Sequence, residues 1–249
     1  MNKKIFIITL VIIIIIIGIV LGVFLSRKDS NNNTIVMVTE AGFAPYEYYE
    51  DGKIVGIDVE IAEEIAKALN KKLEIKDVEF DSILNEVKFG RADFAAAGLT
   101  ITKERAEEVD FTIEYTKTKQ VIIVPKDSNI KTIEDIKEKT VSIQTGSLPD
   151  LYISEEYPNV NIIHTSTISA SIADIKAGKA DFTATDELPA KEIIRNNPDL
   201  IILEEPLVEN SFGIAVKKGN TELLNQINDV LDKLIQEGKI EEYTLKYNK

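Results

Sequence analysis

A seven-residue segment occurs twice in this chain and limits the folds that the chain can adopt. The first copy, Gly-Arg-Ala-Asp-Phe-Ala-Ala, occupies residues 90–96, and the second, Gly-Lys-Ala-Asp-Phe-Thr-Ala, occupies residues 178–184. Each copy follows an amphipathic helical stretch, and its glycine can take the left-handed conformation that ends a helix. Each copy therefore predicts a helix, a turn and a short strand, and the repeat predicts two similar lobes.

Polar residues follow both of these predicted strands. The first strand continues into Gly98, Leu99 and Thr100, and the second continues into Thr185 and Asp186. Ligands of open α/β sheets bind at the carboxyl ends of the strands. We therefore expect the functional site in a cleft between these two edges.

Composition excludes several classes of function. The chain has 249 residues, of which 44% are hydrophobic and 29% charged, so it can bury an ordinary globular core. It has no cysteine, which excludes disulfides, thiolate nucleophiles and thiolate-bound zinc. Without residues 1–33, 25 basic and 41 acidic residues remain, and the net charge falls from −13 to −16. Such an acidic surface repels nucleic acid.

The first 33 residues differ in composition from the rest. Residues 5–25 carry no charge and are dominated by isoleucine, with Lys3 and Lys4 before them and Arg27 and Lys28 after them. That length spans a bilayer as a helix, so we expect residues 1–28 to be an uncleaved signal anchor, with a cleaved signal peptide and secretion as the alternative. Residues 29–33 are the expected polar linker, and the body of the protein is expected outside the cytoplasm.

Hydrophobic strands and amphipathic helices alternate after residue 33. Predicted strands cover residues 35–38, 73–78, 94–97, 141–144 and 161–164, and predicted helices cover residues 58–69, 81–89, 133–137, 150–157 and 221–236. A hairpin is expected to turn at Asp51 and Gly52, and Asp58 and Thr221 are expected to cap their helices. Gly238 is expected to end the last of these helices. Such alternation is typical of a mainly parallel sheet with helices on both faces.

Two β-rich segments, 120–124 and 212–216, bracket the middle of the chain. We expect them to cross between the lobes as a hinge. The predicted fold is therefore α/β, with two Rossmann-like lobes joined by a two-strand hinge and preceded by a transmembrane helix. Residues 34–119 and 210–249 are expected to form the first lobe, and residues 120–209 the second.

Several motifs, in order and with the right spacing, carry a resemblance to a known family. They are Phe-Ala-Pro-Tyr-Glu-Tyr at 43–48, Gly-Ile-Asp-Val-Glu-Ile-Ala at 56–62, Gly-Leu-Thr-Ile-Thr-Lys-Glu-Arg at 98–105, and Gln-Thr-Gly-Ser at 144–147. Together with the second repeat they resemble the family 3 solute-binding proteins, the polar amino-acid receptors of ABC importers. The resemblance implies the type II periplasmic binding protein fold, a monomer without cofactor or metal, and ABC permease subunits as partners.

A free amino acid carries a carboxylate and an ammonium group on one carbon, so its receptor needs a fixed cationic donor and a fixed anion. The resemblance assigns these roles to Arg105 and Asp186. Taken alone, Arg105 would be interpreted as a surface helix residue, and Asp186 as the N-cap of the helix that follows it. The resemblance also implies that Gly98 and Thr100 contact the ligand's main-chain groups.

The second lobe is expected to contribute backbone amides. Gly146 and Ser147 lie at a strand-to-helix turn, where their N–H groups would face the ligand carboxylate. The threonine that often follows this pair in the family is replaced by Leu148 and Pro149, which weakens one expected contact.

Four further positions match the family's side-chain pocket. Phe43 and Phe80, with Tyr46 nearby, would enclose the ligand side chain, although aromatic residues in such folds are more often part of the core. Glu40 lies where relatives that select cationic or amide side chains carry an acid, and Gln144 is another pocket position. The implied ligand is a polar or cationic L-amino acid such as arginine, lysine, histidine or glutamine, and Glu40 disfavours glutamate.

Two alternatives remain open at this point. Cyclohexadienyl dehydratases share the fold and use an acid in the cleft, for which Glu187 is the nearest candidate, and turnover of prephenate or arogenate would identify one. Against an enzyme, His164 is the only histidine, and no nucleophilic triad, metalloprotease or phosphate-loop spacing occurs. A membrane-tethered amino-acid sensor is the other alternative, which gene neighbourhood would separate from an importer.

Overall fold

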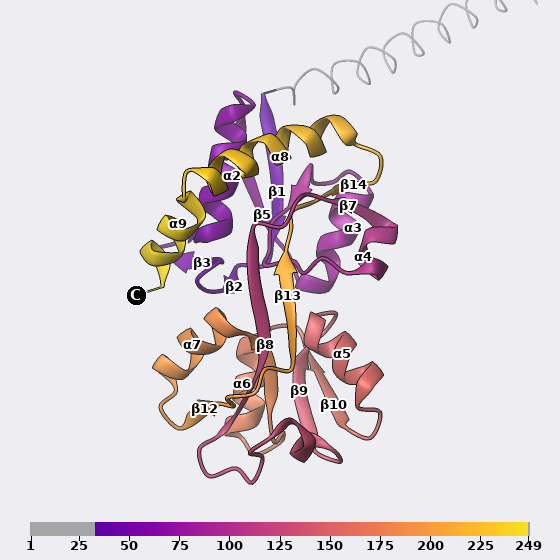
Figure 1. Ribbon diagram of the computed structural model, residues 1–249, viewed down its shortest axis with the longest axis vertical. Helices are drawn as coiled ribbons and strands as arrows, with labels where there is room; N and C mark the ends of the chain where they lie inside the picture. The colour runs from indigo at the N-terminus through magenta and orange to yellow at the C-terminus, as the bar shows by residue number, and fades with distance from the viewer. Residues whose placement is uncertain (1–32, 249) are drawn as a thin grey trace, which may run out of the picture.

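A computed structural model describes residues 33–248. The expected signal anchor and residues 29–32 of the expected linker therefore lie outside the described residues. Within residues 33–248, no helix has the length and apolar character needed to cross a membrane. The described chain forms two lobes arranged one above the other along the long axis, with two long strands running between them (Figure 1).

Lobe 1 is built around a five-stranded sheet in the order β5-β1-β6-β14-β7. Its strands are β1 (Thr34–Thr39), β5 (Lys72–Asp77), β6 (Phe94–Ala95), β7 (Val109–Phe111) and β14 (Ala215–Lys217). β1 is parallel to β5 and β6, whereas β14 is antiparallel to β6 and β7. The sheet is therefore mixed, with a parallel half made by the first part of the chain.

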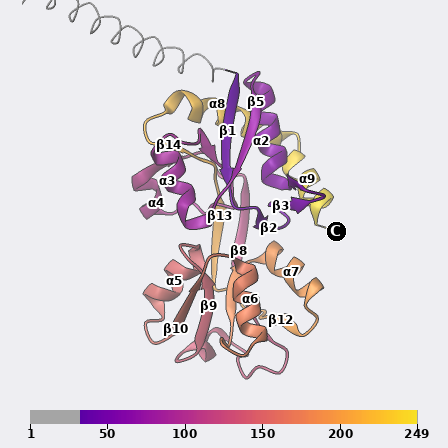
Figure 2. The ribbon, with the colours of Figure 1, turned by 180° about the vertical axis from the view of Figure 1, so that it is seen from behind.

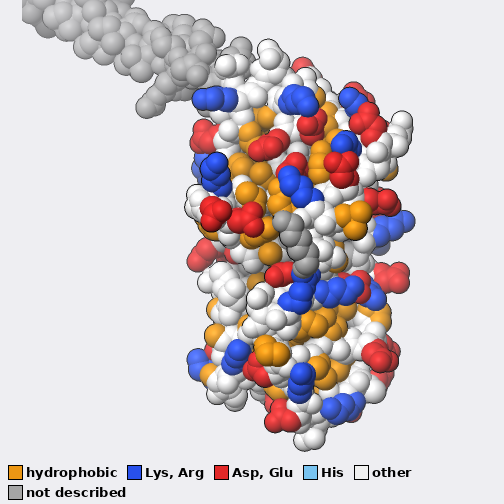
Figure 3. All heavy atoms as spheres, turned by 90° about the vertical axis from the view of Figure 1, so that its left-hand side faces the viewer, with side chains coloured by type: hydrophobic (Ala, Val, Ile, Leu, Met, Phe, Trp, Pro, Cys, Tyr) orange, Lys and Arg blue, Asp and Glu red, His pale blue; other side chains and the backbone are white. Residues whose placement is uncertain are grey.

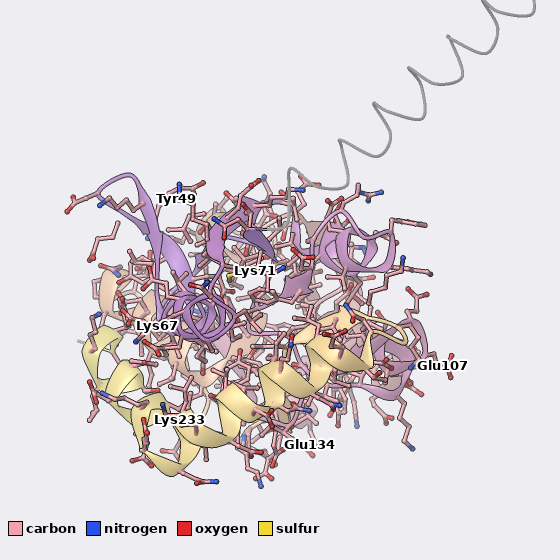
Figure 4. All side chains as sticks on the ribbon, turned by 90° about the horizontal axis from the view of Figure 1, so that it is seen from above. Tyr49, Lys67, Lys71, Glu107, Glu134 and Lys233 are labelled. Atoms are coloured by element: carbon pink, nitrogen blue, oxygen red, sulfur yellow. The ribbon has the colours of Figure 1, made fainter. Side chains whose placement is uncertain are left out.

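Helices cover both faces of the lobe 1 sheet. One hydrophobic cluster joins the sheet to α2 (Ile57–Ala68), α8 (Thr221–Gln236) and α9 (Lys239–Tyr247), and another joins it to α3 (Ile83–Lys88). Seen from above, α8 lies across the lobe beside α2, with Lys67 and Lys233 on this outer side (Figure 4). A small sheet of β2 (Gly42–Phe43), β3 (Glu47–Glu50) and β4 (Lys53–Val55) completes lobe 1. Its predicted turn is confirmed, because Asp51 and Gly52 have φ of 50° and 76°.

Lobe 2 is formed by the part of the chain that runs from β8 to β13, which contains a second set of strands. β8 (Thr116–Pro125) pairs antiparallel with β11 (Thr183–Asp186) and β12 (Leu200–Ile202), while β9 (Thr140–Gln144) is parallel to β10 (Asn161–Thr165). A bridge between Val141 and Phe182 connects the two groups of strands. Helices α5 (Leu148–Glu156), α6 (Ile168–Lys176) and α7 (Glu187–Asn196) pack around them, and a short 3₁₀ turn occupies Ile133–Ile136. Another 3₁₀ turn, Phe80–Ser82, directly precedes α3 in lobe 1.

The two strands that run between the lobes are β8 and β13 (Val208–Phe212), which lie side by side in both ribbon views (Figures 1 and 2). They pair antiparallel from Thr116 opposite Phe212 to Gln120 opposite Val208. The expected continuous strand over 212–216 is wrong, because the chain leaves β13 at Gly213 and enters β14 at Ala215. At this break the Gly213 N–H donates to Leu99 O and the Ile214 N–H to Thr112 Oγ1.

The repeated segment has the same role in both lobes. Gly90 and Gly178, with φ of 68° and 70°, follow α3 and α6. The aspartate of each copy then accepts a hydrogen bond from the backbone of a neighbouring strand: Asp93 Oδ2 from Val36 N at 2.7 Å and Asp181 Oδ2 from Thr140 N at 2.8 Å. The prediction of two similarly built lobes is therefore confirmed at these positions.

Two cap predictions are wrong. Gly56, not Asp58, is the N-cap of α2, and the Asp58 carboxylate is buried, accepting hydrogen bonds from Gly98 N at 2.9 Å and Tyr115 Oη at 2.7 Å. Asn220, not Thr221, caps α8. Gly238 does follow α8 in the left-handed conformation, as expected.

On the surface, acidic and basic side chains are interspersed over both lobes on the face shown in Figure 3.

Candidate functional site

A cavity lies where the two lobes meet. Lobe 1 contributes residues from the ends of its strands and from the loops that follow them, and lobe 2 contributes residues from the same end of its sheet. The lining residues are Glu40, Phe43, Phe80, Gly98, Thr100, Arg105, Gln120, Gln144, Ser147, Leu148, Pro149, Ile168, Ala184, Thr185 and Asp186. Nine of the ten predicted site residues are among them, and Gly146 is the exception.

Arg105 provides a buried cation in this cavity. It lies in α4 (Lys103–Glu108), whose N-cap Thr102 accepts a hydrogen bond from the Arg105 N–H at 3.2 Å. Its Nη1 donates to Thr100 O at 2.8 Å, and its Nη2 crosses to lobe 2 and donates to Gly146 O at 2.9 Å. Burial lowers the pKa of the guanidinium to about 10, so the group remains charged at neutral pH. Three of its five N–H donors remain for a ligand.

Asp186 provides a carboxyl group on the opposite wall. It ends β11 and occupies the N-cap position of α7, yet its side chain makes no capping bond to that helix. Asn210 Nδ2 donates to Asp186 Oδ1 at 3.1 Å. Burial raises the pKa of this carboxyl to about 7, a shift that hydrogen bonding from Gln120 and Asn210 opposes. A ligand cation placed beside Asp186 would favour its ionised form.

Gly98 and Thr100 form the floor of the cavity in lobe 1. Gly98 has φ +51°, and a Cβ at this position would lie 2.6 Å from Phe43 Cε1, so only glycine fits there. The Gly98 N–H donates a hydrogen bond to Asp58 Oδ2, so the Gly98 carbonyl oxygen is the backbone group that remains for a ligand. Thr100 Oγ1 accepts a hydrogen bond from Asn210 Nδ2 at 3.0 Å, so its own hydroxyl hydrogen remains for a ligand acceptor.

The remaining wall combines aromatic rings with polar groups. Phe43 and Phe80 line the cavity, and the Phe80 ring lies 5.6 Å from Arg105 Cζ. Tyr46 does not line it: the ring is 1% exposed and stacks on Phe43 from the core side. Glu40 is buried, which raises the pKa of its carboxyl to about 6, although a hydrogen bond from Gln144 opposes this shift. An acid in this position suits a cationic ligand group.

The amides expected from Gly146 and Ser147 are occupied, which corrects their predicted role. The Gly146 N–H donates to Asp150 Oδ2 at 2.8 Å, and the Ser147 N–H donates to Gln144 O. The physical reason is that Asp150, in the first turn of α5, reaches back to the turn before the helix. Gly146 instead presents its carbonyl to Arg105, and the Ser147 side chain caps α5.

The arrangement can hold a small zwitterion. A carboxylate can approach the free guanidinium donors of Arg105 and the hydroxyl of Thr100, while an ammonium group can approach Asp186 and the carbonyl of Gly98. No group of histidine and carboxylate residues suited to a metal ion occurs within residues 33–248. Glu187, the acid of the dehydratase alternative, pairs with Lys191 at 2.9 Å and Lys119 at 3.6 Å and is not among the lining residues.

A comparison with known protein families identifies the family of this chain. The model of the bacterial extracellular solute-binding proteins, family 3, matches residues 35–249. The chain belongs to this family. Among its relatives, the arginine-binding extracellular protein ArtP of Bacillus subtilis is 31% identical over 228 residues, covering 89% of each chain. The glutamine-binding protein GlnH of the same organism is 29% identical over 226 residues, covering 89% of this chain and 83% of GlnH.

Solved structures of the family have the same fold. The crystal structure of a substrate-binding protein of an amino acid ABC transporter superposes with a TM-score of 0.82 at 37% identity, covering 86% of this chain and 98% of that one. The holo arginine-binding protein of T. maritima superposes with a TM-score of 0.79 at 34% identity, covering 84% and 93%. The mixed α/β fold of this chain is therefore that of family 3 solute-binding proteins.

Sequence reasoning missed several residues of the cavity. Gln120, on β8, lines the cavity, although the sequence predicts only a hinge role for its strand. Asn210, on β13, has no predicted role, yet it donates hydrogen bonds to the lining residues Thr100 and Asp186. Ile168 and Ala184 also line the cavity, but they are apolar, so their residue types predict core positions and do not indicate a site. The polar character of Gln120 within a β-branched strand is the signal that could have identified it.

Proposed function

We propose that this family 3 protein is the extracytoplasmic receptor of an ABC importer for a cationic L-amino acid. In this proposal Arg105 binds the ligand carboxylate and Asp186 binds its ammonium group. Glu40 accepts hydrogen bonds from the cationic side chain, whose aliphatic part packs between Phe43 and Phe80. The protein acts by binding rather than by catalysis, and its partner is the permease of the importer.

One observation carries the proposal: a buried guanidinium from lobe 1 and a buried carboxyl from lobe 2 line the same cavity. A free amino acid is the smallest common ligand that satisfies both charges at once. The third charged group, Glu40, adds the preference for a cationic side chain over an anionic one. Relatives named for arginine and histidine binding support the same class of ligand.

Lobe closure is the proposed mechanism. The lobes are connected by β8 and β13, so small rotations in these strands change the separation of Arg105 and Asp186. A ligand that contacts both residues binds the closed state better than the open state, and it shifts the population by that difference in affinity. The closed state is then the form that the permease recognises.

Calorimetric titration of the full chain, purified in detergent, tests this function. We expect L-arginine or L-lysine to bind more tightly than L-glutamine, and L-glutamate to bind most weakly. Arg105→Ala should weaken binding at least tenfold, because a charge-assisted hydrogen bond contributes roughly 1.5 to 3 kcal/mol and about 1.4 kcal/mol corresponds to a factor of ten. Arg91→Ala, which removes an exposed arginine of the same lobe, is the control.

The outcomes separate the parts of the proposal. If none of the probed amino acids binds, the receptor function is wrong. If Arg105→Ala binds as tightly as the parent chain, the carboxylate contact is wrong. Glu40→Gln tests the side-chain contact separately, since it should reduce the preference for L-arginine over L-glutamine without abolishing L-glutamine binding.

A further inference from the structure

Asn210 lies beside the cavity and contacts two of the polar residues that line it. It lies on the crossing strand β13, opposite Thr118 of β8. Its Nδ2 lies 3.0 Å from Thr100 Oγ1 of lobe 1 and 3.1 Å from Asp186 Oδ1 of lobe 2. Its Oδ1 accepts a hydrogen bond from Gln120 Nε2 of the other crossing strand at 3.2 Å. One side-chain amide thus connects both lobes and both crossing strands.

We propose that Asn210 is a positioning residue, which sets the orientation of Thr100 and Asp186 for an amino-acid ligand and ties that orientation to the closed arrangement of the lobes. This inference rests on the proposed function, because Thr100 and Asp186 are ligand groups only if the cavity holds an amino acid.

The hydrogen-bonding capacity of an amide explains why this residue type suits the position. An amide nitrogen carries two hydrogens and can donate to both acceptors, whereas its oxygen accepts from Gln120. By donating to Thr100, Asn210 leaves the threonine hydroxyl hydrogen for a ligand carboxylate. By donating to one oxygen of Asp186, it leaves the other oxygen for a ligand ammonium. Aspartate at this position would have no donor and would face Asp186 with a second negative charge.

The two acceptors also explain the link to closure. Thr100 follows β6 and moves with lobe 1, while Asp186 ends β11 and moves with lobe 2. Asn210 can donate to both only when Thr100 Oγ1 and Asp186 Oδ1 lie within about 6 Å of each other, since each hydrogen bond spans about 3 Å from nitrogen to oxygen. Opening the lobes must break at least one of the two bonds. The amide therefore favours the same arrangement that a ligand favours.

The protonation of Asp186 provides a readout that a purely structural role would not change. Arg105 on α4 favours the ionised form of this carboxyl. The other titratable groups that interact with it are Tyr46 and Glu47, and Glu187 follows it in α7. The Asn210 donor is a further group that stabilises the ionised form. Its removal should raise the pKa of Asp186, so that ligand binding requires a higher pH.

The experiment is titration of the full chain with L-arginine between pH 5.5 and pH 8.5. For the wild type, affinity should rise with pH and level off above about pH 7, where Asp186 is ionised. Asn210→Ala should bind about tenfold more weakly at pH 7, with the midpoint of its pH profile about one unit higher, as expected for a lost hydrogen bond to a charged group. Asn210→Asp should shift the midpoint further, because it adds a like charge.

Two variants serve as references. Glu209→Gln changes the exposed neighbouring side chain on β13 and should keep the wild-type affinity and midpoint. In Asp186→Asn, the change in L-arginine affinity that accompanies ionisation of Asp186 should be absent, and this is the change whose midpoint Asn210→Ala should move to higher pH. Glu40 titrates alike in the wild type and in the Asn210 variants, so the difference between their profiles reports on Asp186.

Each outcome decides the matter. Weaker binding with a displaced midpoint supports the inference, and an unchanged affinity and midpoint overturn it. Weaker binding with the wild-type midpoint also overturns it, since the residue would then have only a structural role. If Asn210→Ala does not fold by far-UV circular dichroism, Asn210→Asp, which keeps the size of the side chain, carries the same test. A wild-type chain that binds none of the probed amino acids overturns the proposed function, and this inference with it.

Discussion

The carboxyl group of Asp186 should make the stability of the unliganded protein depend on pH, and Asp186→Asn should remove that dependence. Asp186 is 5% exposed, and burial raises the pKa of its carboxyl from 3.8 to about 7. The folded protein therefore binds this proton more tightly than the unfolded chain does. Stability from this group is fully present below the unfolded pKa and is lost as the pH rises through the folded pKa.

The size of the effect follows from the same shift. While the folded state holds the proton and the unfolded chain does not, the free energy of unfolding falls by about 1.4 kcal/mol per pH unit. Because this window closes near the folded pKa, the loss from Asp186 between pH 5 and pH 7 should be about 2 kcal/mol. Other buried carboxyls, such as Glu40, add to the wild-type slope, so the difference between wild type and Asp186→Asn isolates this one group.

Urea unfolding of the full chain at pH 5, 6, 7 and 8, in the absence of amino acids, measures this difference. The curve of unfolding free energy against pH should be flatter for Asp186→Asn than for the wild type by about 2 kcal/mol over this range. Asp232→Asn, which removes an exposed carboxyl on α8, should run parallel to the wild type. Parallel curves for the wild type and Asp186→Asn would show that Asp186 is ionised throughout, and would refute the argument from burial.

Three further predictions concern residues of lobe 1. Gly98→Ala should weaken amino-acid binding at least tenfold with an unchanged far-UV circular dichroism spectrum, because its Cβ would displace the Phe43 ring. Gly178→Ala is the control, since it has the same left-handed backbone and open space around it. Burial raises the pKa of Glu47 well above its usual range, so Glu47→Gln should change the unfolding free energy by less than about 1 kcal/mol. Asp58→Asn should cost about 2 kcal/mol or more in urea unfolding, because it weakens two buried hydrogen bonds.

The fold was predictable because its signals are local and repeated. Helix, glycine, turn and strand follow one another twice, and each signal depends on residues close in the sequence. The cap of α2 was not predictable in the same way. Asp58 stands where an N-cap is expected, but its carboxylate is used by Gly98 and Tyr115, which lie far along the chain. A local rule fails where a buried long-range partner competes for the same oxygen atoms.

The candidate site also combines residues that the sequence predicts with contacts that depend on partners far along the chain. The family motifs pointed to Glu40, Arg105 and Asp186, all of which line the cavity. Asn210 could not be found in this way, because its place in the site depends on the register of β13 against β8. The occupied amide of Gly146 depends likewise on how Asp150 turns back from the first turn of α5. Such details follow from tertiary geometry, which residue types and spacing do not specify.

The duplicated scaffold explains how one architecture can serve a ligand with two opposite charges. Both copies of the repeat bury their phenylalanine, and the aspartate of each binds a neighbouring strand. After the phenylalanine the copies diverge: the first continues through three alanines to Gly98, and the second continues through two threonines and an alanine to Asp186. A symmetric pair of lobes would present like charges on both walls and would repel one end of a zwitterion. The divergence therefore has to occur where the strands end, because only there do the two lobes face the same cavity.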